Sequence, residues 1–301
     1  TKKFILNPGQ LDGHAQPEIR LDFRSPQTTG LAAGDWCPFG TQGEAPTGQR
    51  EEDGKSLVFD TEPLTERLEI LGAPRLTLTL AVDRPTAFIA VRLNDVAPGG
   101  ASTRVTYGLL NLTHRTGHNQ PTPLVPGQRY EIEIRLNDIA HAFPAGHRIR
   151  VAISTSYWPI AWPAPEPVML SLFTGASRLE LPVRPPRPED ALLPAFAGPE
   201  SAPGPLRSEL RPARFKRTIE RDLTTNETVY TTFNDGGDFG TASLIRLEDI
   251  DLDVGHSILR QFRIGETDPL SARAEISQIA EFNRPNWAIK IETRTELWST
   301  R

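Results

Sequence analysis

Between residues 56 and 183, apolar side chains recur at every second position, and this alternation limits the fold to one built from β-strands. In the stretch RLTLTLAV, Leu76, Leu78 and Leu80 fall on one face of an extended chain. The stretches RYEIEIRLND and HRIRVAIS repeat the pattern, and turn residues such as Pro98 and the two glycines after it separate such runs. Many short antiparallel strands with one apolar face predict a β-sandwich, and we expect a jelly roll.

A proline-rich stretch divides the chain. Nine prolines lie between Pro182 and Pro212, a composition that resists helix and central strand and favours an extended linker. After it the alternation resumes as a meander of strands. We therefore predict three parts: a jelly-roll domain at 1–184, a linker at 185–212 and a second antiparallel β domain at 213–301. The sequence starts at Thr1 without a methionine, and the strand pattern is still running at Arg301, so we expect the natural protein to extend beyond both.

Charge and residue usage argue against several classes of partner. The formal net charge is -5 and no lysine or arginine cluster occurs, which argues against nucleic acid. No apolar run approaches the roughly 20 residues of a membrane span. The single cysteine, Cys37, excludes an internal disulfide, and no cysteine or histidine pair has zinc-finger spacing. We predict no metal, no cofactor, no nucleic-acid partner and no membrane partner, and the cytoplasm of a bacterium is our expectation for localisation.

The chain lacks a recognisable catalytic motif. A serine hydrolase of the α/β type carries its nucleophile in a Gly-x-Ser-x-Gly turn between strand and helix. The nearest matches begin at Gly175 and Gly255, and both lack the closing glycine. His141 and His147 flank the turn AFPAG, where we expect them to hydrogen-bond to the backbone. We assign no catalytic residue to this chain.

One acidic run resembles the opening of a calcium loop. Asp249, Asp251 and Asp253 have the spacing, but Val254 stands where the loop needs glycine, and the twelfth position is not glutamate. Apolar residues alternate with these acids. We predict a strand with a charged outer face and leave a calcium site open as the alternative.

Three long stretches are similar to a known family. They are GLAAGDWCPFG, then the run from VFDTEPLTERLEILG through LLNLTHR, then the run from PLVPGQRYEIEIRLND through FPAGHRIRVAISTSYWPIAWPAPEP. Together they resemble the carboxy-terminal domain of the X-Pro dipeptidyl-peptidase and cocaine esterase-like acyl esterase superfamily of serine hydrolases, over roughly residues 20–185.

This resemblance implies a galactose-binding-like jelly roll that follows an α/β-hydrolase domain holding the serine, acid and histidine. None of these three has a counterpart in this chain. It further implies an accessory role: packing on the hydrolase domain of the same polypeptide and helping to shape its pocket, through which small ester or peptide substrates are reached. The 301 residues alone should be inactive, and the exposed interface should favour a homo-oligomer or other self-association.

The same resemblance suggests two sets of site residues. Trp36 and Phe39 correspond to a loop near the mouth of the active site, so they are candidates for lining an acyl or aromatic pocket, with simple interdomain packing as the alternative. Tyr157, Trp158 and Trp162 lie in a proline-rich aromatic stretch after a predicted strand and are candidates for interdomain docking. They could instead close the jelly roll itself. A carbohydrate-binding or protein-interaction β-sandwich module is the alternative function.

Overall fold

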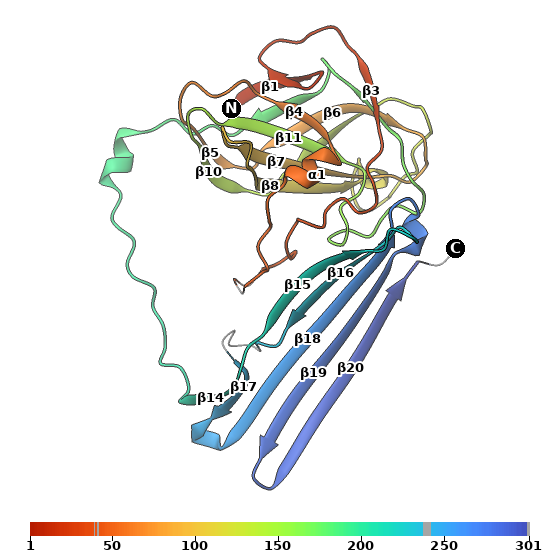
Figure 1. The fold of residues 1–301 in the computed structure, drawn as a ribbon. Coiled ribbons are helices and arrows are strands. Elements are labelled where there is room, and N and C mark those ends of the chain that lie inside the picture. The colour runs from red at the N-terminus through yellow and green to blue at the C-terminus, as the bar shows by residue number, and fades with distance from the viewer. Residues whose placement is uncertain (39, 41, 237–241, 300–301) are drawn as a thin grey trace. The chain divides into compact units, whose positions relative to one another are not determined.

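The computed structural model describes residues 1–38, 40, 42–236 and 242–299 (Figure 1). They divide into two compact units. The first contains residues 1–36, 46–185 and 266–270, and the second contains 37–45, 186–265 and 271–301 as far as these are described. Both are built almost entirely of antiparallel strands, so the predicted all-β class is confirmed at that level.

The first unit has an 11-stranded and a 2-stranded sheet. Its strands are β1 (Lys2–Asn7), β2 (Gln10–Asp12), β3 (Arg20–Phe23), β4 (Leu57–Asp60), β5 (Leu68–Gly72), β6 (Arg75–Val82), β7 (Phe88–Val96), β8 (Ser102–Asn111), β9 (Tyr130–Arg135), β10 (Ile139–Phe143), β11 (Arg148–Ser154), β12 (Leu170–Phe173) and β13 (Arg178–Leu181). The larger sheet runs β3-β12-β6-β13-β1-β2-β4-β11-β7-β8, with β9 also paired to β6, and β5 pairs with β10. Helix α1 (Arg50–Gly54) and the 3-10 turn η1 (Leu112–His114) also belong to this unit.

The core of this unit follows the alternation in the sequence. Leu76, Leu78 and Leu80 of β6 are fully buried, as their shared face predicts. Opposite them on β9, Ile132 and Ile134 are buried, while the glutamates that alternate with them, Glu131 and Glu133, are exposed. Because side chains alternate across a strand, the register of β6 with β9 collects these apolar residues in one core.

The second unit is a 7-stranded antiparallel sheet (Figure 1). Its strands are β14 (Arg207–Pro212), β15 (Phe215–Arg221), β16 (Glu227–Asn234), β17 (Ala242–Leu247), β18 (Leu252–Gly265), β19 (Arg273–Arg284) and β20 (Trp287–Trp298), with 3-10 turns η2 (Pro188–Leu192), η4 (Glu248–Ile250) and η5 (Pro269–Ser271). Strand β14, which pairs with β17, and turn η2 both lie inside the stretch predicted as linker. Among the described residues, no helix is long and apolar enough to cross a membrane.

Candidate functional site

The segment that leads to Trp36 is the part of the first unit where several predicted site residues can be placed. The Trp36 side chain is 75% exposed. The neighbouring Cys37 is also exposed and makes no disulfide. Phe39, the other predicted pocket residue, lies outside the described residues. The exposed indole of Trp36 is therefore the candidate contact surface of this loop.

The residues before Trp36 are bound to the segment 154–158, which contains two of the predicted docking residues. The backbone amide of Trp158 donates to the carbonyl oxygen of Thr29 at 2.7 Å. The Ser156 hydroxyl donates to the carbonyl oxygen of Gln27 at 3.1 Å. These hydrogen bonds join two stretches far apart in sequence, so the base of the loop is part of the folded domain.

Gly30 lies at the closest approach of these two stretches. Its φ is +112°, in the range that favours glycine, and an added Cβ would lie 2.6 Å from the carbonyl oxygen of Trp158. Its amide donates to Glu52 Oε2 at 2.6 Å, and the amide of Ala32 donates to Glu52 Oε1 at 3.2 Å. The Glu52 carboxylate, on α1, is 1% exposed. Glu52 therefore links α1 to the backbone of the loop at Gly30 and Ala32.

Tyr157 and Trp158 are each 1% exposed. Tyr157 packs with Ala33 and Ala90, and its hydroxyl accepts a hydrogen bond from Arg104 Nη1 at 2.7 Å. Burial raises the pKa of the Tyr157 phenol, and the positive charge of Arg104 partly opposes that effect. Side chains this deeply buried favour the alternative that they close their own domain.

Trp162 differs from its two neighbours because it is only half-buried. Its ring meets that of Trp158 edge to face, with 5.2 Å between ring centroids. Trp162 is thus held by a buried aromatic residue while part of its own surface stays accessible. Interdomain docking stays a prediction, and of the three aromatic residues Trp162 is the one whose exposure suits it.

Helix α1, which carries Glu52, is held by a buried network of charged groups. Asp53 on α1 accepts hydrogen bonds from Asn94 at 2.8 Å, Ser102 at 2.7 Å and Arg150 at 3.0 Å. It also forms an ion pair with the fully buried Arg92 at 3.3 Å. Burial lowers the pKa of Arg92, and the negative charge of Asp53 opposes that effect. Every charge in this network has a partner, so its chemistry is structural.

Sequence reasoning missed this network. In β7, Arg92 and Asn94 alternate with the core residues Val91 and Leu93 and so lie on the opposite face of the strand. Residues 49–56 cover that face, and both side chains are 0% exposed. The acidic cluster in REEDG was the available signal, but nothing in its spacing says which strand it would cover.

The two histidines near the turn AFPAG bind a side chain, so the prediction that they bind backbone is wrong. His141 Nε2 lies 3.1 Å from Asp95 Oδ2, and His147 Nδ1 lies 2.7 Å from Asp95 Oδ1. Asp95 is on β7, and it lies opposite Ile149 of β11, two residues after His147. A carboxylate shared by two imidazoles orients them, but the described contacts of this group include no serine hydroxyl.

Two of the three aspartates in the acidic run at 249–253 pair with one arginine. Arg246 forms ion pairs with Asp251 at 3.3 Å and Asp253 at 2.8 Å. The predicted strand is replaced over residues 248–250 by a 3-10 turn, and β18 begins at Leu252. Within the described ranges, no group of three or more histidine, cysteine or acidic side chains is arranged to hold a metal ion.

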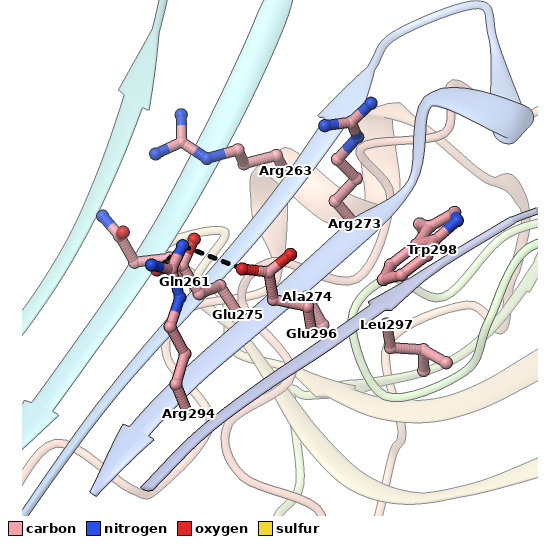
Figure 2. A pocket seen from close by; sticks show the side chains of 9 residues that line it. All are labelled: Gln261, Arg263, Arg273, Ala274, Glu275, Arg294, Glu296, Leu297 and Trp298. Atoms are coloured by element: carbon pink, nitrogen blue, oxygen red, sulfur yellow. Dashed lines mark ion pairs between the residues drawn. The ribbon is translucent and has the colours of Figure 1, made fainter. Parts of the chain in front are cut away.

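The second unit has a cavity of about 380 Å³ on its sheet (Figure 2). Its lining comes from β18, β19 and β20 and consists of Gln261, Arg263, Arg273, Ala274, Glu275, Arg294, Glu296, Leu297 and Trp298. Arg294 forms ion pairs with both carboxylates of this lining, with Glu275 at 3.0 Å and with Glu296 at 2.8 Å. We assign no catalytic chemistry to this polar surface.

Comparison with known proteins identifies the first unit. Residues 1–185 match the family model of the X-Pro dipeptidyl-peptidase C-terminal non-catalytic domain. The chain belongs to this family. The predicted membership is confirmed. The match ends at residue 185, which is also the last residue of the longest segment of the first unit.

The relatives of this domain are longer proteins. The chain is 29% identical to cocaine esterase from Rhodococcus sp. over 103 residues, which are 34% of this chain and 18% of that protein. It resembles an α-amino acid ester hydrolase structure with a TM-score of 0.52 and 24% identity, over 60% of this chain and 36% of that one. An aminopeptidase from a marine sediment Thaumarchaeota archaeon gives a TM-score of 0.51 at 21% identity, over 60% and 37%. At these identities the two structures show the shared fold alone.

Proposed function

We propose that this chain is the accessory, non-catalytic region of a serine hydrolase of the acyl esterase or X-Pro dipeptidyl-peptidase type. In this proposal the first unit is a galactose-binding-like jelly roll that packs on an α/β-hydrolase domain of the same polypeptide. The family match over residues 1–185 supports the non-catalytic assignment. The small share of cocaine esterase that the chain covers is consistent with a catalytic part elsewhere.

The pocket role rests on one contrast: the Trp36 ring is exposed, whereas the backbone at residues 27–32, the base of its loop, is held by hydrogen bonds. The base is held by Glu52 and by Trp158, whereas the Trp36 ring is 75% exposed. A large apolar ring on an anchored backbone is suited to contact another surface, because little conformational freedom is lost on binding. We propose that Trp36 lines an acyl or aromatic pocket of the neighbouring hydrolase domain.

Active-site labelling tests the accessory role. A fluorophosphonate probe is applied to the 301-residue chain and to the full polypeptide that its gene encodes. Label on the longer polypeptide alone supports the proposal, because the probe reacts with an activated serine. Label on the 301 residues would mean that they contain a nucleophile, and label on neither would remove the hydrolase assignment.

Substitution of Trp36 tests the pocket role in the full polypeptide. Trp36→Ala should lower kcat/KM by about tenfold, which corresponds to about 1.4 kcal/mol, and should change the preference between small and bulky acyl esters. Leu71→Ala is the matched control, since Leu71 is 55% exposed on β5 of the same unit. Equal losses for all acyl groups would indicate that Trp36 only packs between domains.

The burial of Trp158 weighs against the carbohydrate-binding alternative. Stacking on a sugar needs an accessible ring face, and Trp158 is 1% exposed. Of the first unit's aromatic residues named here, only Trp36 is largely exposed, since Trp162 is half-buried against Trp158. Quenching of tryptophan fluorescence by polysaccharides, lost in Trp36→Ala, would revive that alternative.

A further inference from the structure

Strand β20 is a long exposed edge of the second unit. It spans 12 residues, all of them exposed, and among the described strands it pairs only with β19. That pairing has no register shift from Arg273–Trp298 to Arg284–Trp287, so β20 is regular along its whole length. The outer backbone groups of such a strand form a template for another strand.

The two faces of β20 have different chemistry. Its odd-numbered face carries large apolar side chains that are 39% to 56% exposed: Trp287, Ile289, Ile291 and Leu297. Its even-numbered face ends in the exposed Trp298 and carries, before it, four charges that alternate in sign: Lys290, Glu292, Arg294 and Glu296. Edge strands of monomers are usually short or interrupted, and a long edge with an apolar row favours association.

The order of the charges specifies one occupant. We propose that β20 pairs with β20 of a second copy of this chain, antiparallel and centred on Thr293. In this register Lys290 lies opposite Glu296 of the second copy, and Glu292 lies opposite its Arg294. The two-fold symmetry repeats both pairs, so four pairs of opposite charge face one another across the new ladder.

The same register also brings the apolar faces of the two copies together. Ile289 lies opposite Leu297 of the second copy, and Ile291 lies opposite Thr295. Directly opposed residues of an antiparallel pair share a face, so the apolar rows of the two copies become continuous. The dimer thus joins two 7-stranded sheets edge to edge.

Neighbouring registers are unfavourable. A shift of two residues in one direction places Lys290 opposite Arg294 and Glu292 opposite Glu292 of the second copy. A shift in the other direction places Arg294 opposite Arg294 and Glu292 opposite Glu296. A shift of one residue places charged side chains opposite apolar ones. The charge pattern therefore selects the register as well as the partner.

Contacts within one copy keep the charged face in place. Arg294 lies between Glu275 and Glu296 in ion pairs of 3.0 and 2.8 Å (Figure 2). Lys290 pairs with Glu292 at 2.5 Å. Exposed pairs of this kind are weak singly, so their main effect is to choose the register, while the backbone ladder and the apolar row supply affinity.

Two charge variants of the full polypeptide test the pairing. Lys290→Glu with Arg294→Glu makes all four charges negative, and Glu292→Lys with Glu296→Lys makes all four positive. We expect wild type to sediment as a dimer and each variant as a monomer, while an equimolar mixture of the two restores a dimer. A monomeric wild type, a variant that stays dimeric, or a mixture that stays monomeric would each overturn the proposal. Circular dichroism checks that both variants are folded.

A disulfide tests the register. Thr293 lies opposite itself, where Cα atoms of antiparallel partners are about 4.5–5.5 Å apart, within disulfide range. Thr293→Cys in a Cys37→Ser background should give a covalent dimer on mild oxidation. Thr295→Cys is the control, because its two copies would be about 14 Å apart along the ladder. Crosslinking at 295, or none at 293, would contradict this register. Neither test depends on the hydrolase assignment, so the dimer and the proposed function can fail separately.

Discussion

The backbone amide of Trp158 donates to the carbonyl oxygen of Thr29 at 2.7 Å, and this hydrogen bond joins two stretches that are distant in sequence. Ser25 and Thr155 extend the contact, since each donates its backbone amide to the other's hydroxyl at 3.1 Å. The aromatic stretch after β11 thus supports the loop that carries Trp36. The loop with Trp36 and the aromatic stretch, which both resemble the same family in sequence, are therefore parts of one local structure.

Replacing Gly30 should destabilise this structure. In Gly30→Ala the Cβ would lie 2.6 Å from the Trp158 carbonyl oxygen, and φ of +112° is strained for alanine. We expect the free energy of unfolding to fall by about 2 kcal/mol or more, measured by urea denaturation. Gly99→Ala is the control, because nothing lies within 4 Å of its added Cβ. Equal effects of the two substitutions would contradict the close contact.

Removing the charge of Asp53 should lower the free energy of unfolding strongly, although the substitution is small. Asp53→Asn removes the carboxylate that forms the ion pair with the buried Arg92, and breaking such a pair costs about 3–5 kcal/mol. Glu51→Gln, two residues earlier on α1, changes an exposed carboxylate and should shift stability by less than about 0.5 kcal/mol. Thermal and urea unfolding of both variants measure the difference. Similar stabilities would show that the buried network contributes little.

The raised pKa of Tyr157 predicts a loss of stability at high pH. Its phenol ionises near pH 10 in the unfolded chain but at higher pH in the folded chain, because burial disfavours the anion. Folded protein therefore binds more protons above about pH 10, and stability falls as pH rises from there through the folded pKa. Below pH 10 this contribution is constant.

Tyr157→Phe isolates that effect. The variant loses the hydrogen bond from Arg104, so it should be less stable at pH 8. Its stability should fall less steeply than that of wild type between about pH 10 and 11, because the titrating group is gone. Urea unfolding across this pH range measures both slopes. Parallel slopes would show that the Tyr157 phenol is not protected from ionisation.

Calcium should leave the protein's stability unchanged. Asp251 and Asp253 already pair with Arg246, and the sequence lacks the glycine and glutamate of a calcium loop. Thermal midpoints in millimolar calcium and in excess chelator should agree within experimental error. A calcium-dependent rise of several degrees, absent with magnesium, would show that the acidic run binds the ion.

Some burial was predictable from residue type and spacing alone. In β6 the alternating leucines mark the buried face without knowledge of the partner strand, because a side-chain period of two is a local property. The burial of Tyr157 and Trp158 was not predictable in this way. An aromatic stretch suits both an interface and a domain interior, and the choice depends on the segment at 25–33 that covers it.

By itself, the sequence determined the β class, the faces of the strands and, through matching stretches over roughly residues 20–185, the family to which the family model assigns residues 1–185. These follow from short-range periodicity and motif identity. Only the tertiary structure decided that α1 covers Arg92, that Asp95 joins two histidines and that β20 pairs, among the described strands, with β19 alone. Such outcomes depend on which distant segments become neighbours, and strand order is a long-range property that local alternation does not encode.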